Sequence, residues 1–231
     1  MGSPNTPYIS LEDGSVILTN DGLSQASTVL YANPLTAPNL QISLHFRMTQ
    51  LDATGLYEDG MGVALLSASN TSFVGGAGMG LGMVNLIGTG IEFDVYSNPC
   101  DPDANHVAID ALNQCISDFS PASYAWTIGL DQTTTLADGT THAAQISLAN
   151  GLWSVSLDGT PLQFFQGPIT TSQLLTTDDT AYDGGVPLLS DAGISAPGEA
   201  YYIALVAATG SYLLRSEIYD VSVSFPTPTC F

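Results

Sequence analysis

The chain has 231 residues, of which 45% are hydrophobic and 10% are charged, so it is long and apolar enough for one large globular domain. Its 22 acidic residues face only two basic ones, Arg47 and Arg215, and the formal net charge is −20. This balance makes nucleic acid and anionic membrane surfaces poor partners, and no stretch is long and apolar enough for direct membrane insertion.

Short β-type runs follow one another along the chain, separated by glycine, asparagine, aspartate and proline. The expected strands are residues 16–19, 28–31, 40–48, 62–66, 90–96, 107–109, 125–130, 141–148, 153–157, 200–207 and 217–225. Within residues 40–48 apolar and polar side chains alternate, which is typical of a half-buried strand. Asp158-Gly159 predicts a hairpin turn, and one helical turn is expected near residues 171–175. The pattern predicts an all-β fold, an antiparallel β-sandwich.

We expect one domain with short flanking segments. Residues 1–8 are interpreted as a tag or N-terminal extension, residues 9–225 as the domain, and residues 226–231 as the start of a linker or stalk rich in proline and threonine. The glycosylation sequon Asn70-Thr71-Ser72 and the cysteines favour a secreted protein, extracellular or at the cell surface.

A dense group of potential metal ligands lies between residues 91 and 110. Alternation places Glu92, Asp94 and Tyr96 on one face of the expected strand, and a loop rich in asparagine, proline and aspartate follows. Carboxylates gathered in this way repel one another unless a cation neutralises them. The sequence therefore predicts a metal site on this strand and loop.

The ligand types indicate two neighbouring ions. Asp94, Asn98, Asp101 and a backbone carbonyl can supply the oxygen ligands that calcium prefers. Glu92 and His106 combine a carboxylate with an imidazole, which suits a transition ion. The spacing predicts that the two ions share Asp94 and Asp101.

Cys100 and Cys115 lie on either side of the expected metal loop. We favour a disulfide between them, which would hold the loop closed. Pairings that involve the third cysteine, Cys230, stay open, because sequence alone does not fix the connectivity.

Several segments, in order along most of the chain, resemble the legume-type (L-type) lectins of the concanavalin A-like fold. They are residues 18–20 (LTN), 30–34 (LYANP), 42–47 (ISLHFR), 58–60 (EDG) with 63–66, 75–83 (GGAGMGLGM), 91–99 (IEFDVYSNP) with 101–110 (DPDANHVAID), 207–210 (AATG) and 216–218 (SEI). Such matches in the family's order are far more specific together than any one alone. The resemblance implies a concanavalin A-like jelly roll.

The resemblance also implies roles for the metal ligands, which are the Tyr96 carbonyl and the side chains of Glu92, Asp94, Asn98, Asp101 and His106. Glu92 and His106 would hold the transition ion, usually Mn²⁺ in this family. Asp94 and Asp101 would bridge it to Ca²⁺, and Asn98 with the Tyr96 carbonyl would complete the calcium site. Asp103 is an alternative to Asp101, although Asp101 keeps the family's five-residue gap to His106.

The sugar-binding residues that the resemblance implies are Asp59, Gly78, Met79, Gly80, Tyr96, Asn98, Ser211 and Tyr212. A carboxylate beside an amide, as in Asp59 and Asn98, can hydrogen-bond to adjacent hydroxyls. A backbone N–H within residues 78–80 would add a donor, and the Tyr96 ring would stack on the sugar. Ser211 and Tyr212 would line the variable edge, and the peptide bond between Glu58 and Asp59 is expected to be cis.

The expected function is that of a non-catalytic, calcium-dependent lectin domain, which binds monosaccharides or oligosaccharides within an adhesin or glycan-recognition protein; a homodimer is a candidate assembly. One alternative is a glycoside hydrolase or polysaccharide lyase on the same sandwich. Residues 92–96 (EFDVY) begin like the hydrolase motif Glu-x-Asp-x-Glu but place Tyr96 at the second glutamate. The other alternative is a structural adhesin domain made rigid by calcium, against which the presence of both Asp59 and Asn98 argues.

Overall fold

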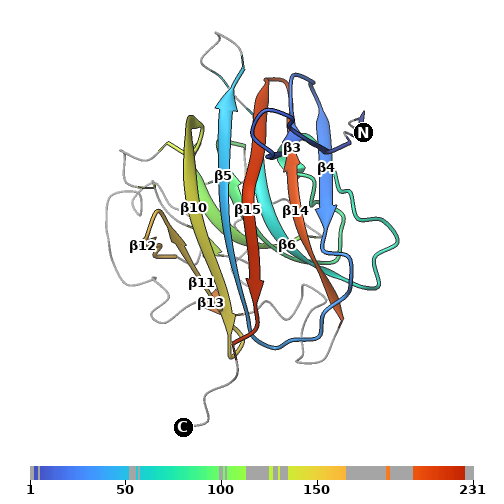
Figure 1. Ribbon diagram of the computed structural model, residues 1–231, viewed down its shortest axis with the longest axis vertical. Helices are drawn as coiled ribbons and strands as arrows, with labels where there is room; N and C mark the ends of the chain where they lie inside the picture. Colours follow the sequence, from blue (N-terminus) through green and yellow to red (C-terminus); the bar gives the residue numbers. More distant parts are fainter. Residues whose placement is uncertain are drawn as a thin grey trace.

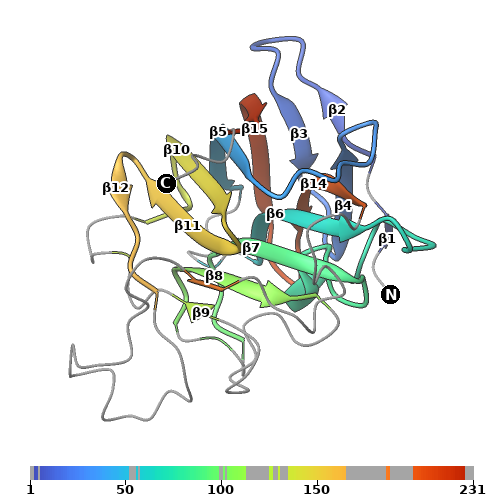
Figure 2. The same ribbon diagram turned by 90° about the horizontal axis from the view of Figure 1, so that it is seen from below.

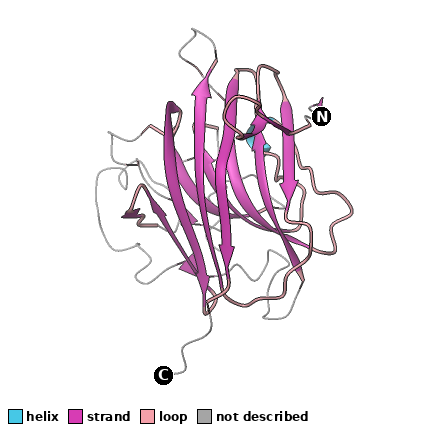
Figure 3. Ribbon diagram, viewed as in Figure 1, coloured by secondary structure: helices cyan, strands magenta, loops and turns pink. Residues whose placement is uncertain are grey.

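The computed structural model describes residues 3–4, 6–51, 56, 58–98, 101, 103–112, 125–126, 130, 135–164, 186–187 and 200–226. Within these residues the strands form two sheets that pack face to face (Figures 1 and 2). Figure 3 shows that strands and loops make up nearly all of the described chain. The predicted all-β sandwich is confirmed.

The first sheet has seven strands, in the order β1 (Ser3–Pro4), β4 (Gln25–Leu30), β14 (Tyr201–Ala208), β6 (Gly60–Ser67), β7 (Gly88–Asp94), β8 (His106–Ala111) and β9 (Ala125–Trp126). The second has eight: β12 (Thr160–Pro161), β11 (Leu152–Leu157), β10 (Asp138–Ala149), β5 (Leu40–Gln50), β15 (Leu214–Ser224), β3 (Val16–Thr19) and β2 (Tyr8–Ile9), with β13 (Val186–Pro187) beside β11. All these pairings are antiparallel except that of β1 with β4.

The main core lies between the two sheets. The alternating residues predicted for the third run face it: Leu40, Ile42, Leu44, Phe46 and Met48 are all buried. Across the core, Phe93 of β7 packs on Phe46 with ring centroids 4.8 Å apart. Trp153 of β11 is fully buried in the same cluster. This apolar layer is what holds the two sheets together.

A second apolar cluster covers the other face of the seven-stranded sheet. Its buried members are Ala64, Leu66, Leu81, Met83, Leu86, Leu112, Ala204 and Val206. Met83 lies against Gly62 and Gly90, since a Cβ at either glycine would come within 3.0 Å of its side chain. The cluster therefore anchors residues 75–83, the glycine-rich segment, to the sheet. It also explains why every residue of β6 is buried.

Several strand limits differ from the predicted ones. The strand predicted at residues 90–96 ends at Asp94, because the Asp94 carboxylate accepts a 2.6 Å hydrogen bond from the Tyr96 N–H and turns the chain. The sequence did not predict the 3₁₀ helix η1 (Gly78–Gly80). Asp158 and Gly159 do form the predicted turn, with φ of 50° and 79°. Of the strand predicted at 125–130, β9 covers the first two residues, and the turn predicted at 171–175 lies outside the described residues.

Both basic residues of the chain pair with one buried glutamate. Glu217 of β15 is 1% exposed, and it accepts 2.8 Å ion pairs from Arg47 Nε and Arg215 Nη2. Arg47 also lies 5.2 Å from the centroid of the Tyr219 ring. This arrangement satisfies a buried carboxylate on the eight-stranded sheet and commits the only two arginines to it. In the part of the chain that the structure describes, no helix is long and apolar enough to cross a lipid bilayer.

Candidate functional site

Four strand ends meet at one end of the seven-stranded sheet. The register pairs Ala208, the last residue of β14, with Gly60, the first residue of β6. Gly60 in turn pairs with Asp94 at the end of β7, and Asp94 pairs with His106 at the start of β8. The loops that leave these strands therefore converge, although they lie far apart in the sequence.

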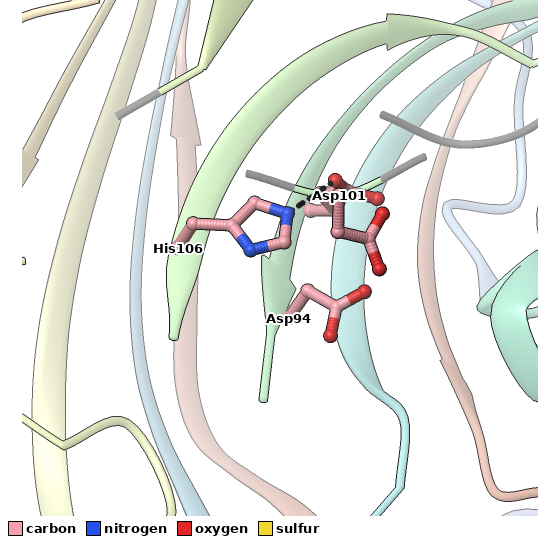
Figure 4. A group of neighbouring side chains, drawn as sticks. Asp94, Asp101 and His106 are labelled. Atoms are coloured by element: carbon pink, nitrogen blue, oxygen red, sulfur yellow. Dashed lines mark hydrogen bonds and ion pairs between the residues drawn. The ribbon is translucent and has the colours of Figure 1, made fainter. Parts of the chain in front are cut away.

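The structure brings four of the predicted metal ligands together. Glu92, Asp94, Asp101 and His106 each place one ligand atom within 4.8 Å of those of the others. Glu92 and Asp94 share one face of β7, and His106 begins the neighbouring strand. Figure 4 shows Asp94, Asp101 and His106 pointing toward one another. The local alternation of β7 and the turn after it are enough to gather them.

Short hydrogen bonds shape the loop that carries Asp101. The Asp101 carboxylate accepts a 2.6 Å bond from the Asn98 N–H, and the Asp101 N–H donates to the Asn98 carbonyl at 3.1 Å. Asn105 accepts a 2.9 Å bond from the Leu136 N–H and donates its own N–H to Asp103 at 2.8 Å. Asp103 thus supports the loop, and Asp101 is the one that joins the cluster.

The contacts of His106 fix how its ring can serve as a ligand. Nδ1 lies 3.0 Å from the Asp103 carbonyl, which can only accept a hydrogen bond, so Nδ1 carries the proton. Nε2 then offers a lone pair, yet it lies 3.1 Å from Glu92 Oε1. Two acceptors at this distance need a proton or a cation between them. The donor set therefore fits a metal ion.

Burial controls the ionisation of the cluster. It raises the pKa of Glu92 and of Asp94, and the neighbouring carboxylates raise both further. Burial also raises the pKa of Asp101 to about 6 and lowers that of His106 to about 3. Without an ion, burial therefore favours the protonated forms of Glu92 and Asp94 and the neutral form of the imidazole.

Asp110 is a further buried carboxylate next to the cluster, and the sequence pattern did not assign it a role. It is 2% exposed on β8, and its charge raises the pKa of Glu92. His106, Ala108 and Asp110 alternate along β8, so the two-residue period from His106 could have placed Asp110 on the same face.

Asp59 and Asn98 also lie together, as predicted for the sugar site. The peptide bond before Asp59 is cis, which confirms that prediction. Burial and the charge of Glu58 raise the pKa of Asp59 to about 8, and the Asn98 side chain lowers it in part. Among the described residues, Asp59 Oδ2 and Asn98 Nδ2 have no hydrogen-bond partner of normal geometry. A buried acceptor and a buried donor are thus left beside each other.

The glycine-rich segment lies next to this pair. A Cβ at Gly78 would be 3.8 Å from Asp59 Oδ2. The Gly78 N–H donates to the Thr209 carbonyl and the Gly80 N–H to that of Ala77. Of residues 78–80, Met79 is therefore the better candidate for a backbone donor to a ligand.

Three more residues predicted for the sugar site, Tyr96, Ser211 and Tyr212, form its other edge. The rings of Tyr96 and Tyr212 lie with centroids 6.3 Å apart, inclined at 40°. The Ser211 N–H donates to the Glu58 carboxylate, and the charge of that nearby carboxylate raises the pKa of Tyr96. Local sequence patterns do not reveal the role of Glu58, because the neighbours of its carboxylate lie 38 and 153 residues away in the chain. Cys100, Cys115 and Cys230 lie outside the described residues, so the predicted disulfide stays a prediction.

Comparisons with solved structures identify the fold. The Ca²⁺/mannose-bound exoplasmic/lumenal domain of VIP36 matches with a TM-score of 0.64 and 13% identity, covering 97% of this chain and 82% of that one. The winged bean acidic lectin complexed with methyl-α-D-galactose matches with a TM-score of 0.66 and 18% identity, covering 96% and 94%. The potassium-bound carbohydrate recognition domain of Emp46p matches with a TM-score of 0.62 and 12% identity, covering 96% and 88%.

These structures are L-type lectins, and the chain has the legume-type lectin fold that its motifs predicted. No protein-family model and no curated protein sequence matches it.

Proposed function

We propose that the chain is a non-catalytic carbohydrate-binding domain whose glycan site depends on bound divalent ions. The observation that carries this proposal is the juxtaposition at one sheet end. The four-ligand cluster lies one loop away from the Asp59 and Asn98 pair, and the Asn98 N–H donates a hydrogen bond to Asp101 of the cluster. The lectin fold of the neighbours named above supports the same conclusion.

Glu92 and His106 would hold a transition ion such as Mn²⁺, and Asp94 and Asp101 would be shared with Ca²⁺. Asn98 and the Tyr96 carbonyl would complete the calcium site. The bound ions would supply positive charge that no side chain of the chain can provide there, because both arginines pair with Glu217. The hydrogen bonds within residues 94–106 already hold these ligands close to one another.

The chain's own residues would recognise the sugar. Asp59 Oδ2 would accept a hydrogen bond from one hydroxyl, and Asn98 Nδ2 would donate one to its neighbour. Since Asp59 is 1% exposed, ligand entry requires a shift of a flanking loop. The Met79 N–H would add a donor, and the Tyr96 and Tyr212 rings would cover the C–H face. We expect monosaccharide dissociation constants of about 1 mM, or roughly −4 kcal/mol, so that adhesion would need several sites.

The metal-ligand role of the carboxyl groups supports a binding role over a catalytic one. Glu92 and Asp94 belong to the four-ligand cluster, and carboxylates that hold ions are not free to exchange protons with a substrate. We also propose that residues 9–225 form a single domain that works outside the cell or in a lumenal compartment.

The test is a glycan array probed with Ca²⁺ and Mn²⁺ present and again after chelation. We expect selective binding that is lost on chelation and restored by adding the ions back. Binding that ignores chelation would remove the metal from the proposal. Failure to bind any glycan with both ions present would overturn the proposed function.

Asp59→Ala should abolish that binding while calcium affinity, measured by calorimetry, changes by less than about threefold, because Asp59 faces the sugar and not the ions. The matched control is Asp220→Ala, which makes the same substitution at an exposed position on the eight-stranded sheet. Retention of glycan by Asp59→Ala would contradict the assignment of Asp59.

A further inference from the structure

Glu58 connects three loops of the candidate site. It precedes Asp59 across the cis peptide bond, and its side chain is buried at 6% exposure. Its carboxylate contacts the loop after β14 through Ser211 and the loop after β7 through Tyr96. A buried charged group with partners on separate loops fixes those loops relative to one another, because each lost contact would leave the charge unpaired.

The contact with the loop after β14 is tight. Ala208 and Gly60 pair across the sheet, so Glu58 and residues 210–211 lie just beyond paired strand ends. The Ser211 N–H donates to Glu58 Oε2. A Cβ at Gly210 would collide with that same oxygen and would come within 3.0 Å of Asp59 Oδ2. The conformation of Glu58 therefore requires glycine at position 210.

The contact with Tyr96 places an aromatic ring. The Tyr96 side chain lies beside both the Glu58 carboxylate and the Tyr212 ring, whose centroid is 6.3 Å from that of Tyr96. Tyr96 and Tyr212 come from the two loops that Glu58 joins. The separation between these rings, and their position relative to Asp59, then depend on a single carboxylate.

We propose that Glu58 is a positioning residue that sets the shape and the selectivity of the glycan site, by locking Ser211–Tyr212 and Tyr96 around Asp59. This inference rests on the proposed function for its ligand, and on the contacts of Glu58 alone for the locking of the loops. Glu58 also places a fixed carboxylate beside Asp59 in a protein of net charge −20. It therefore disfavours carboxylated and sulfated sugars and directs the site toward neutral ones.

The locking is tested without any ligand, by hydrogen exchange of the backbone amides with calcium present. In Glu58→Ala we expect the Ser211 amide to exchange at least about tenfold faster, because a hydrogen bond to a charged acceptor is lost. Glu58→Gln keeps an acceptor oxygen and should show a smaller increase. Glu12→Gln, an exposed glutamate between β2 and β3, is the charge control and should change nothing. Unchanged exchange at residues 210–212 in Glu58→Ala would overturn the locking.

The selectivity is tested on the glycan array with the same variants. We expect Glu58→Ala to weaken the preferred neutral glycan by about tenfold and to change the ranking among glycans, with calcium affinity within about twofold of the wild type. Glu58→Gln should gain binding to anionic relatives of that glycan. An array profile identical to that of the wild type would overturn the selectivity role. Wild-type protein that binds no glycan would overturn the proposed function and this role together, while the exchange experiment would still decide the locking.

A double-mutant cycle distinguishes the specific effect of Glu58 on the loops from a general loss of folding. Gly210→Ala should displace the Glu58 carboxylate, so the Ser211 amide should exchange faster, as it does in Glu58→Ala. In the Glu58→Ala background the same substitution should have a smaller effect, because Glu58 Oε2, the nearer of the two oxygens that the new Cβ meets, is gone. Additive effects of the two substitutions would show that Gly210 and Glu58 act independently.

Discussion

At the scale of single residues, the candidate site gathers buried carboxyl groups with no positively charged side chain to compensate them. Glu92, Asp94 and Asp101 lie within one cluster, and Asp59 lies one loop away. His106 is the nearest basic group, and burial keeps it neutral by lowering its pKa to about 3. The carboxyl groups must therefore hold protons or share a cation from solution. Binding of a cation at this cluster would therefore be coupled to folding.

The pH dependence of the metal-free protein follows from these shifts. The pKa of Asp59 is about 8 in the folded state, against about 3.9 in an unfolded chain, so the folded state binds more protons between these values. Stability is therefore fully present below the unfolded pKa and is lost as the pH rises toward 8. His106 opposes this trend only below about pH 6.5, where the unfolded chain takes up its proton.

We expect the free energy of unfolding of the chelated protein to fall by about 2 kcal/mol or more between pH 6.5 and 8, measured by denaturant titration. With saturating Ca²⁺ and Mn²⁺ the fall should disappear, because the ions require the ionised carboxylates. A chelated protein that gains stability over this range would contradict the assigned protonation.

At the scale of elements, the sequence predicted those strand limits and buried faces that depend on local patterns. β3 has the predicted limits, and the alternation in β5 identified its buried face. The gathering of Glu92, Asp94, Asp101 and His106 was predictable because residues 92–106 form one strand end and one loop. The end of β7 was not predictable, because a hydrogen bond between the Asp94 carboxylate and the Tyr96 N–H ends the strand although the alternating pattern continues. The role of Glu58 depends on a contact across 153 residues, which no local pattern contains.

The anchoring of the glycine-rich segment can be tested on two methionines of that segment. Met83 is 0% exposed and fills the space over Gly62 and Gly90, whereas Met79 is 42% exposed. We expect Met83→Ala to lower the free energy of unfolding by about 2–4 kcal/mol, through lost burial and the cavity that remains. It should also weaken glycan binding, because the loop beside Asp59 loses its anchor.

Met79→Ala is the matched control for that experiment. It keeps the backbone N–H, and it should change the free energy of unfolding by less than about 0.5 kcal/mol. Equal losses of stability in the two variants would show that the second apolar cluster does not hold the segment.

At the scale of the whole molecule, the two sheets have different roles. The seven-stranded sheet is covered on its outer side by the second apolar cluster and carries the candidate site at one end. The eight-stranded sheet closes the main core and holds both arginines on Glu217. The remaining acidic residues give the molecule a strongly negative field, which attracts divalent ions and repels polyanions.

The pairing of both arginines with Glu217 also determines which proteases can cut the folded chain. Enzymes that cleave after lysine or arginine find no lysine and only two arginines, each within a long central strand. β5 and β15 pair along most of their length, so cleavage there requires opening the centre of the sheet. We expect trypsin to leave the native domain intact under conditions in which a protease specific for acidic residues cuts its loops. Glu217→Ala should make the same two bonds susceptible, and rapid tryptic cleavage of the wild type would show that the arginines are not held in this way.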